Sequence, residues 1–189
     1  MEIRSTDALI AVDVQNDFCP GGALPVPFGD TIVSKVNSLV IKFETLVFSR
    51  DWHPNNHCSF SDTPLFEDMS WPMHCVQDSP GAEFHGDLFV PGDGRVISKG
   101  TDPEREAYSA FEGTDLDAWL RERGVERVFV AGLAFDYCVR ATAVDAARAG
   151  YETWVVEDAC AGISEVTMER AREELTAAGV QFCGTSDFT

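Results

Sequence analysis

The stretch Arg127–Cys138 (RVFVAGLAFDYC) decides the fold, because an apolar strand ends in it and a helix begins. Residues 127–132 are β-branched, aromatic and small, and they end on glycine, as is typical of a parallel strand covered on both faces. From Cys138 the chain is rich in alanine as far as Gly150, a natural helix stop. Cys138 is therefore predicted at a helix N-terminus, where unpaired N–H groups and the helix dipole favour a thiolate. A buried cysteine that only packs is the alternative interpretation.

On both sides of this stretch, strand-like and helix-like segments alternate. Strands are expected at residues 8–14, 45–49, 95–98, 127–132, 152–157 and 180–183. Helices are expected at residues 30–43, with Asp30 as N-cap, 115–123, 138–149 and 165–178, with Ser164 as N-cap. This alternation predicts an α/β fold of three layers, in which a mostly parallel central sheet carries helices on both faces. The length and composition suit a single domain over residues 1–189.

The charge balance and the cysteine content limit the class of protein. The chain has 14 Lys and Arg against 32 Asp and Glu, a formal net charge of −18, and such a surface repels nucleic acid. The apolar runs are only as long as strands, so we expect no membrane span, and the N-terminus does not resemble a secretion signal. The six cysteines show no regular disulfide spacing, so we expect reduced thiols and a cytoplasmic protein.

Four reactive side chains fall at the ends of predicted strands. Asp13 closes the first strand, Asp51 follows the second, Lys99 follows the third and Cys138 follows the fourth. Because the carboxyl ends of parallel strands meet at the edge where ligands bind, we expect all four to face one crevice. A buried Asp13 needs a partner, and Lys99 is the obvious one, although a lysine that only reaches solvent is the alternative. With the thiol, this pair would supply a base, a charge stabiliser and a nucleophile.

The histidines all lie in the irregular stretch 51–94, and a loop of that length inside a compact domain is usually functional. Asp51 and His53 are two residues apart, so both side chains can point the same way from an extended segment. His57 or His74 would complete a set of three ligands, leaving open positions for water or substrate. The pattern therefore predicts an open metal site.

Two alternatives to this metal site stay open at the level of sequence. Histidines in a loop without metal are one, and a closed structural zinc site with thiolate ligands is the other. The thiols near enough in sequence for a closed site are Cys58 and Cys75. One carboxylate and two imidazoles suit zinc, iron or manganese alike, so the donor set does not identify the ion.

An ordered set of motifs resembles the nicotinamidases, also called pyrazinamidases, of the isochorismatase-like cysteine hydrolase superfamily. The matching segments are residues 12–18 (VDVQNDF), 49–54 (SRDWHP), 57–60 (HCSF), 71–76 (WPMHCV), 98–100 (SKG), 108–111 (YSAF) and 132–143 (GLAFDYCVRATA). The Asp-Trp-His and Trp-Pro-x-His segments are the ones that separate metal-containing nicotinamidases from metal-free relatives. The resemblance implies the isochorismatase-like fold.

The resemblance also assigns roles to individual residues. The implied catalytic triad consists of Asp13, Lys99 and Cys138. A cis peptide before Ala134 is implied as well, which turns the N–H groups of Ala134 and Cys138 into an oxyanion hole. The implied ligands of one divalent metal ion are Asp51, His53 and His74, with His57 a ligand in some members. The implied lining of the ring pocket is Phe18, Trp71, Tyr108 and Tyr137, for which ordinary aromatic core is the alternative.

The implied reaction is hydrolysis of nicotinamide to nicotinate and ammonia through a thioester on Cys138, as a step of NAD salvage. The metal, zinc as first choice with iron or manganese in its place, would bind the pyridine nitrogen. Pyrazinamide is implied as a further substrate. The expected partner is thus a small molecule, and the sequence is also compatible with a homo-oligomer.

The sequence departs from the family pattern at a few positions. Phe28 stands where a glycine is common, and Glu106-Ala107 replaces a usual Asp-Ser pair before Tyr108, which leaves details of the pocket open. Three other functions stay open. They are an amidohydrolase of the same superfamily acting on a non-pyridine amide, a hydrolase using metal-bound hydroxide, and a catalytically silent metal-binding module.

Overall fold

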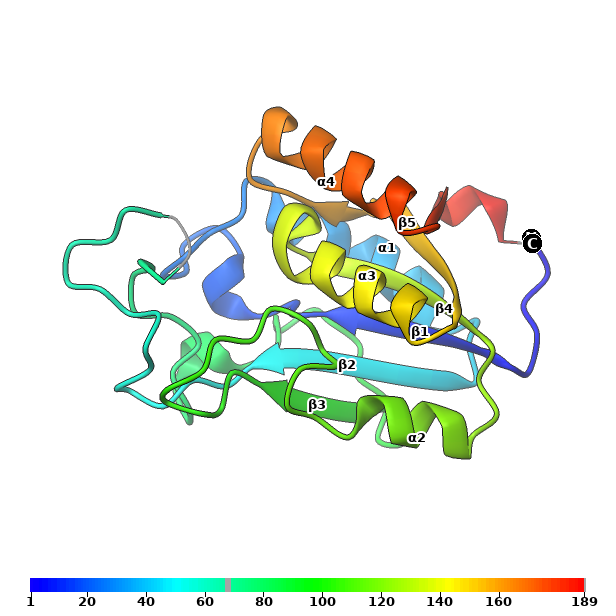
Figure 1. Ribbon diagram of the computed structural model, residues 1–189, viewed down its shortest axis with the longest axis horizontal. Helices are drawn as coiled ribbons and strands as arrows, with labels where there is room; N and C mark the ends of the chain where they lie inside the picture. The colour runs from blue at the N-terminus through cyan, green and yellow to red at the C-terminus, as the bar shows by residue number, and fades with distance from the viewer. Residues whose placement is uncertain (67–68, 189) are drawn as a thin grey trace.

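The computed structural model describes residues 1–66 and 69–188, and this part of the chain contains one six-stranded sheet with every pair parallel (Figure 1). The strand order is β3-β2-β1-β4-β5-β6, so β1 and β4 are central. The strands are β1 (Asp7–Val12), β2 (Thr45–Asp51), β3 (Arg95–Lys99), β4 (Arg127–Leu133), β5 (Glu152–Ala161) and β6 (Gln181–Cys183). The predicted α/β class with a parallel central sheet is confirmed.

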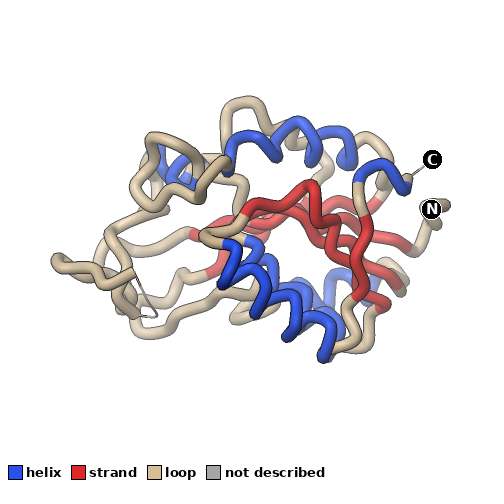
Figure 2. Tube along the Cα trace, turned by 90° about the horizontal axis from the view of Figure 1, so that it is seen from above, coloured by secondary structure: helices blue, strands red, loops and turns tan. Residues whose placement is uncertain are grey.

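Helices lie on both sides of the sheet, as Figure 2 shows. α1 (Val33–Val40) contacts β1 and β5, whereas α3 (Arg140–Arg148) contacts β4, β5 and α4 (Glu165–Ala177). The short α2 (Leu116–Glu122) precedes β4. Within the described residues, no helix is long and apolar enough to cross a membrane.

The core is centred on β1 and β4, where every residue is buried. Their β-branched and aromatic side chains pack under the helices of both faces, as the apolar runs in the sequence predict. The two backbones approach closely at the carboxyl end of the pair. There Gly132 has a φ of 128°, and a Cβ on it would lie 2.1 Å from the carbonyl oxygen of Val12. Only glycine therefore fits this position in β4.

All six strands differ from their predicted bounds by one to four residues, and β1 and β5 illustrate why. β1 ends at Val12 instead of residue 14, because Asp13 has a φ of 49° and leaves the extended conformation. β5 continues to Ala161 instead of ending at residue 157. Its pairing with β4 shifts register after Val130 and resumes at Gly132, an irregularity that a repeating pattern in the sequence does not reveal.

The helix starts differ from prediction at two places and agree at a third. Asp30 is no N-cap, since it lies inside a 3₁₀ turn (Gly29–Ile32) that runs into α1. α3 begins at Arg140, after a π-helical turn (Phe135–Val139) that contains Cys138. Ser164 does cap α4, as predicted, because its hydroxyl accepts the Thr167 N–H at 3.2 Å.

The two ends of the sheet are used differently. The loops that follow β1, β2 and β3 all extend beyond the carboxyl ends of the strands, on the left in Figure 1. Both chain termini lie at the opposite end, where the Met1 amino group donates to the carbonyl of Asp187. The carboxyl end is therefore the place where loops can form a site.

Candidate active site

The carboxyl ends of β1, β2 and β3 bring three charged side chains together. Asp51, the last residue of β2, is in register with Lys99, the last residue of β3. Asp13 follows directly on β1, and its N–H donates to the carbonyl of Ser49 in β2 at 3.1 Å. All three charged side chains are buried. The strand ends therefore converge as the sequence predicts.

Lys99 lies at the centre of this group, with a side chain that is 0% exposed. Its Nζ lies 2.9 Å from Asp13 Oδ2 and 3.4 Å from Cys138 Sγ. It also donates to an oxygen of Asp51 and, at 3.2 Å, to the carbonyl of Ala107. Burial by itself lowers the pKa of Lys99, but the two carboxylates outweigh it and raise the pKa well above its ordinary value. The ammonium therefore stays charged although it has no contact with solvent.

Asp13 has one satisfied and one available carboxylate oxygen. Ser49 Oγ donates to its Oδ1 at 2.6 Å. Within the described chain, its Oδ2 faces Lys99 but accepts no hydrogen bond of good geometry. An oxygen of Asp13, an oxygen of Asp51 and Cys138 Sγ lie within 4.8 Å of one another. Burial raises the pKa of Asp13 against the opposing effect of Lys99, so this carboxylate is a stronger base than an exposed one.

Cys138 lies in the π-helical turn at the end of β4 and is 6% exposed. The Leu133–Ala134 peptide just before this turn is cis, as the resemblance implies. Burial raises the pKa of Cys138 well above its ordinary value, and Lys99 only partly opposes this effect. This shift favours the thiol form of Cys138, whereas the helix N-terminus, as the sequence predicts, favours the thiolate. Removal of the thiol proton needs an adjacent base.

Three side chains beside this group form a set of metal donors. One donor atom each from Asp51, His53 and His74 lies within 4.8 Å of the others, and all three residues are buried. His53 Nδ1 bonds the carbonyl of Gly100 at 2.8 Å, and His74 Nδ1 bonds the carbonyl of Pro72 at 2.7 Å. Because a carbonyl only accepts, each Nδ1 carries a proton, and Nε2 is the nitrogen that can bind an ion. One carboxylate and two such imidazoles fit a divalent transition-metal ion.

The approach of His53 to β3 depends on Gly100. This glycine has a φ of 61°, and a Cβ on it would lie 2.3 Å from the His53 ring. A side chain at this position would therefore displace the imidazole that the Gly100 carbonyl orients.

His57 is a neighbour of this donor set with both ring nitrogens engaged. Its Nε2 bonds the carbonyl of Arg105 at 3.1 Å, and its Nδ1 bonds the hydroxyl of Ser59 at 2.8 Å. Its ring packs on that of His53, with the ring centroids 4.1 Å apart. The geometry thus places Asp51, His53 and His74 in one group of metal-capable side chains and His57 in a second one, with His53 and Glu106.

The closed zinc site with thiolate ligands finds no support in the geometry. Among residues 1–66 and 69–188, neither Cys58 nor Cys75 belongs to a group of metal-capable side chains with donor atoms in mutual reach. Cys75 is buried, and burial raises its thiol pKa well above the ordinary value. A buried, protonated thiol acts as packing.

Two residues that sequence reasoning did not single out anchor the metal donors. Gln15 Nε2 donates to the carbonyl of Asp51 at 2.8 Å, and Gln15 Oε1 accepts the N–H of Asp51 at 2.8 Å. Asp17 Oδ2 accepts the N–H of Cys75, the residue after His74, at 2.7 Å. An amide at position 15, two residues after Asp13 in an otherwise apolar segment, is the signal that could have identified the first anchor.

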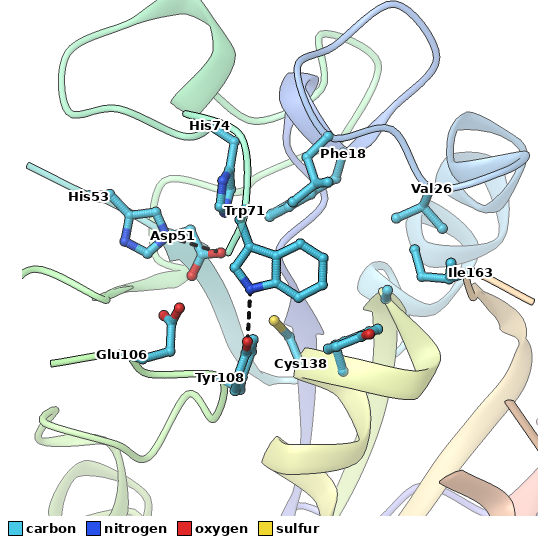
Figure 3. A pocket seen from close by; sticks show the side chains of 13 residues that line it. Phe18, Val26, Asp51, His53, Trp71, His74, Glu106, Tyr108, Cys138 and Ile163 are labelled. Carbon is cyan, nitrogen blue, oxygen red and sulfur yellow. Dashed lines mark hydrogen bonds and ion pairs between the residues drawn. The ribbon is translucent and has the colours of Figure 1, made fainter. Parts of the chain in front are cut away.

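The four predicted aromatic residues surround one pocket with the thiol and the metal donors at its wall (Figure 3). Trp71 Nε1 donates to the hydroxyl of Tyr108 at 2.9 Å, and its ring meets that of Tyr137 edge-on at 5.4 Å between centroids. Phe18 contacts His74, with 5.6 Å between ring centroids. The lining is complete with Leu24, Val26, Asp51, His53, His74, Glu106, Ala134, Cys138 and Ile163.

The pocket has a polar and an apolar side. In Figure 3, the metal donors and Glu106 lie on one side of Trp71, whereas Val26 and Ile163 lie on the other. Neither Val26 nor Ile163 was predicted, because each sits in a loop without regular hydrophobic periodicity. A flat heteroaromatic ring with a polar substituent matches such a division.

Comparison with known proteins agrees with this architecture. Residues 7–187 match the model of the isochorismatase domain. The chain belongs to the isochorismatase family. A curated relative in this family is the nicotinamidase/pyrazinamidase of Mycobacterium tuberculosis, which is 42% identical over 95% of this chain and 99% of its own length.

Two solved structures of the family are similar to the whole chain. The pyrazinamidase of Pyrococcus horikoshii in complex with zinc has a TM-score of 0.88 and 50% identity, over 95% of this chain and 99% of that one. The structure of PnC1 from L. infantum in complex with nicotinate has a TM-score of 0.92 and 36% identity, over 100% of this chain and 98% of that one. The isochorismatase fold predicted by resemblance is confirmed.

Proposed function

We propose that this member of the isochorismatase family is a nicotinamidase, an amidohydrolase that converts nicotinamide to nicotinate and ammonia, and that it also deamidates pyrazinamide. The observation that carries the proposal is the shared pocket. Lys99 Nζ lies 2.9 Å from Asp13 and 3.4 Å from Cys138, and the donors Asp51, His53 and His74 border the same cavity. The relatives from M. tuberculosis and P. horikoshii, named for nicotinamide or pyrazinamide hydrolysis, support it.

In the first half of the reaction, Asp13 takes the proton of the Cys138 thiol. Its raised pKa and its available Oδ2 suit this role, and the ammonium of Lys99 stabilises the thiolate that forms. The sulfur then attacks the carboxamide carbon, and the N–H groups of Ala134 and Cys138 bind the oxyanion, a contribution of about 3 kcal/mol for each donor. Asp13 returns the proton to the departing nitrogen, so that ammonia leaves and a thioester remains.

In the second half, Asp13 activates a water molecule that attacks the thioester carbon. The C–S bond breaks, the proton held by Asp13 returns to Cys138, and nicotinic acid leaves and loses its carboxyl proton to solvent, which gives nicotinate. The same carboxylate therefore serves as base and acid in both halves. Lys99 keeps its charge throughout, because its pKa lies well above the ordinary value.

The aromatic residues hold the ring of the substrate. Phe18, Trp71, Tyr108 and Tyr137 offer apolar faces to a flat heterocycle, and the hydrogen bond between Trp71 and Tyr108 fixes two of these rings. When the pocket encloses the ring of nicotinamide, the carboxamide is the part of the substrate that reaches Cys138. The close sizes of the pyridine and pyrazine rings make pyrazinamide a second substrate.

The residues that would hold a divalent metal ion are Asp51, His53 and His74, and zinc is the ion present in the relative from P. horikoshii. When bound, the ion would accept the ring nitrogen as a ligand and so fix the orientation of the substrate. Gln15, Gly100 and Pro72 orient these ligands in its absence.

The test is ammonia release from nicotinamide and from benzamide, which lacks the ring nitrogen, before and after treatment with a chelator. We expect hydrolysis of nicotinamide, loss of the activity on chelation and its recovery with zinc, with benzamide a poor substrate throughout. Hydrolysis of benzamide at the same rate as nicotinamide would contradict the substrate assignment. Full activity after complete removal of metal would contradict the role of the ion.

A further inference from the structure

Glu106 is a carboxylate in the pocket wall to which no role has been given above. It lies on the side of the metal donors, opposite the apolar wall (Figure 3). A carboxylate oxygen of Glu106 lies within 4.8 Å of a ring nitrogen of His53 and of a ring nitrogen of His57. Of the two imidazoles, His53 is a proposed ligand, so Glu106 borders the place where an ion would bind.

The local backbone fixes the direction of this carboxylate. Glu106 Oε1 accepts the N–H of the next residue, Ala107, at 3.0 Å. The carbonyl of Ala107 in turn accepts from Lys99 Nζ at 3.2 Å, and the carbonyl of Arg105 accepts from His57. The carbonyls on both sides of Glu106 are thus hydrogen-bonded to side chains of the site, His57 and Lys99. Glu106 is half-buried there, with its side chain directed toward the donors (Figure 3).

The negative charge of Glu106 has no lysine or arginine partner among residues 1–66 and 69–188. No lysine or arginine in the described part of the chain forms an ion pair with it. A half-buried carboxylate beside two imidazoles, with neither a lysine nor an arginine as partner, is well placed to attract a divalent cation.

The charges of the site balance only when Glu106 is counted. Asp13 and Asp51 carry two negative charges, and Lys99, which contacts both, carries one positive charge. With a divalent ion bound, the two carboxylates, the ammonium and the ion would together carry one excess positive charge. Glu106 supplies the missing negative charge and makes the sum zero.

We infer that Glu106 is an anionic member of the cation site, which raises the affinity for the divalent ion by neutralising its charge from beside His53. The inference rests on the proposed function, since it concerns the same ion. It assigns to Glu106 a positioning and charge-balancing role and no contact with the carboxamide. The difference from the usual Asp at this position lengthens the side chain and keeps its charge.

The test compares zinc affinity of the metal-free wild-type chain with that of Glu106→Gln, by competition with a chromophoric chelator. Glutamine keeps the oxygen that accepts from Ala107 and removes only the charge. We expect the dissociation constant for zinc to rise about tenfold, as for other residues that support metal ligands. The control is Glu104→Gln, which removes the same charge from an exposed residue of the same loop and should leave the constant within about twofold.

An equal zinc affinity of Glu106→Gln and the wild type would overturn the inference. A raised KM for nicotinamide at saturating zinc, with unchanged zinc affinity, would also overturn it and make Glu106 a substrate contact. Glu106→Asp, which keeps the charge, should retain most of the affinity. Absence of zinc binding by the wild-type chain would contradict the proposed function itself, so the two failures are distinguishable.

Discussion

Buried ion pairs lie at both ends of the sheet, but the groups that surround them differ. At the amino end, Asp7 in β1 is in register with Arg127 in β4. Arg127 Nε donates to Asp7 Oδ1 at 2.8 Å, and its Nη2 donates to Oδ2 and to the carbonyl of Glu2. The backbone N–H of Arg4 donates a further hydrogen bond to Asp7 Oδ2, at 2.7 Å. Both side chains of this pair are hydrogen-bonded, as a structural ion pair requires.

The carboxyl end has the same kind of charges in a different arrangement. One ammonium, on Lys99, lies between Asp13 and Asp51, and a thiol lies beside it. Asp13 Oδ2 lacks a hydrogen bond of good geometry within the described residues, and the group borders a pocket. The comparison teaches that burial of charge alone does not mark an active site. What marks it is a carboxylate and an ammonium beside a nucleophile at the wall of a pocket.

The largest effect should come from the carboxyl end. We predict that Cys138→Ala lowers kcat for nicotinamide by about 10⁴-fold or more, because the covalent route is lost. Ammonia release, measured with zinc present, checks this. The matched control is Cys160→Ala, which removes another buried thiol, on β5, and should keep wild-type kcat. Loss of activity in both variants would show a general effect of core disruption instead.

Disruption of the ion pair at the amino end should lower the stability of the protein and leave its kcat unchanged. We predict that Asp7→Asn lowers the free energy of unfolding by about 3 kcal/mol, because it leaves Arg127 buried without its counter-charge. Urea denaturation measures this change. The folded variant should keep its kcat at 25 °C, since Asp7 lies at the far end of the sheet. A kcat as low as that of Cys138→Ala would contradict the distinction between the two ends.

The anchoring of the metal donors should give an intermediate effect. We predict that Gln15→Leu raises the dissociation constant for zinc about tenfold, because the backbone of Asp51 loses both hydrogen bonds to the amide. Chelator competition measures the constant. Asn37→Leu is the matched control, since Asn37 bonds the backbone of Asp87 and Phe89 in the same way, away from the pocket. Equal zinc affinity in Gln15→Leu and Asn37→Leu would contradict the proposal that Gln15 anchors Asp51.

The smallest effect concerns pH. Asp13 must be ionised to accept the thiol proton, and burial raises its pKa above the usual 3.8, so kcat/KM should fall as the pH drops through this raised value. The hydrogen bond from Ser49 opposes the rise. Ser49→Ala should therefore move the acid limb of the profile to higher pH. A shift of the limb to lower pH would contradict the assignment of Asp13 as the base.

Some of this site follows from sequence because strand ends converge in a parallel sheet. Asp13, Asp51, Lys99 and Cys138 could be grouped from their positions after apolar runs, and the structure places them together. The aromatic lining and the cis peptide at Ala134 came from family resemblance alone. Neither periodicity nor propensity contains that information.

Other features could not be predicted because they depend on tertiary contacts. The positive φ of Asp13, which ends β1 two residues early, has no signature in an apolar run. The pKa of Cys138 is raised by burial more than the ammonium of Lys99 lowers it, and the extent of that burial depends on tertiary packing. The hydrogen bond of His57 Nε2 depends on the carbonyl of Arg105, 48 residues further along the chain. Local sequence determines none of these three properties.

The central claim is that the sulfur of Cys138 and the metal donors act on one substrate in one pocket. The most direct measurement is a crystal structure of the zinc-loaded chain with the aldehyde analogue of nicotinamide, whose carbonyl carbon a nucleophilic thiol attacks without a leaving group. The account predicts a covalent bond from Cys138 Sγ to that carbon, with the ring nitrogen on the ion held by Asp51, His53 and His74. A bond to another residue, or a ring bound away from the ion, would contradict it.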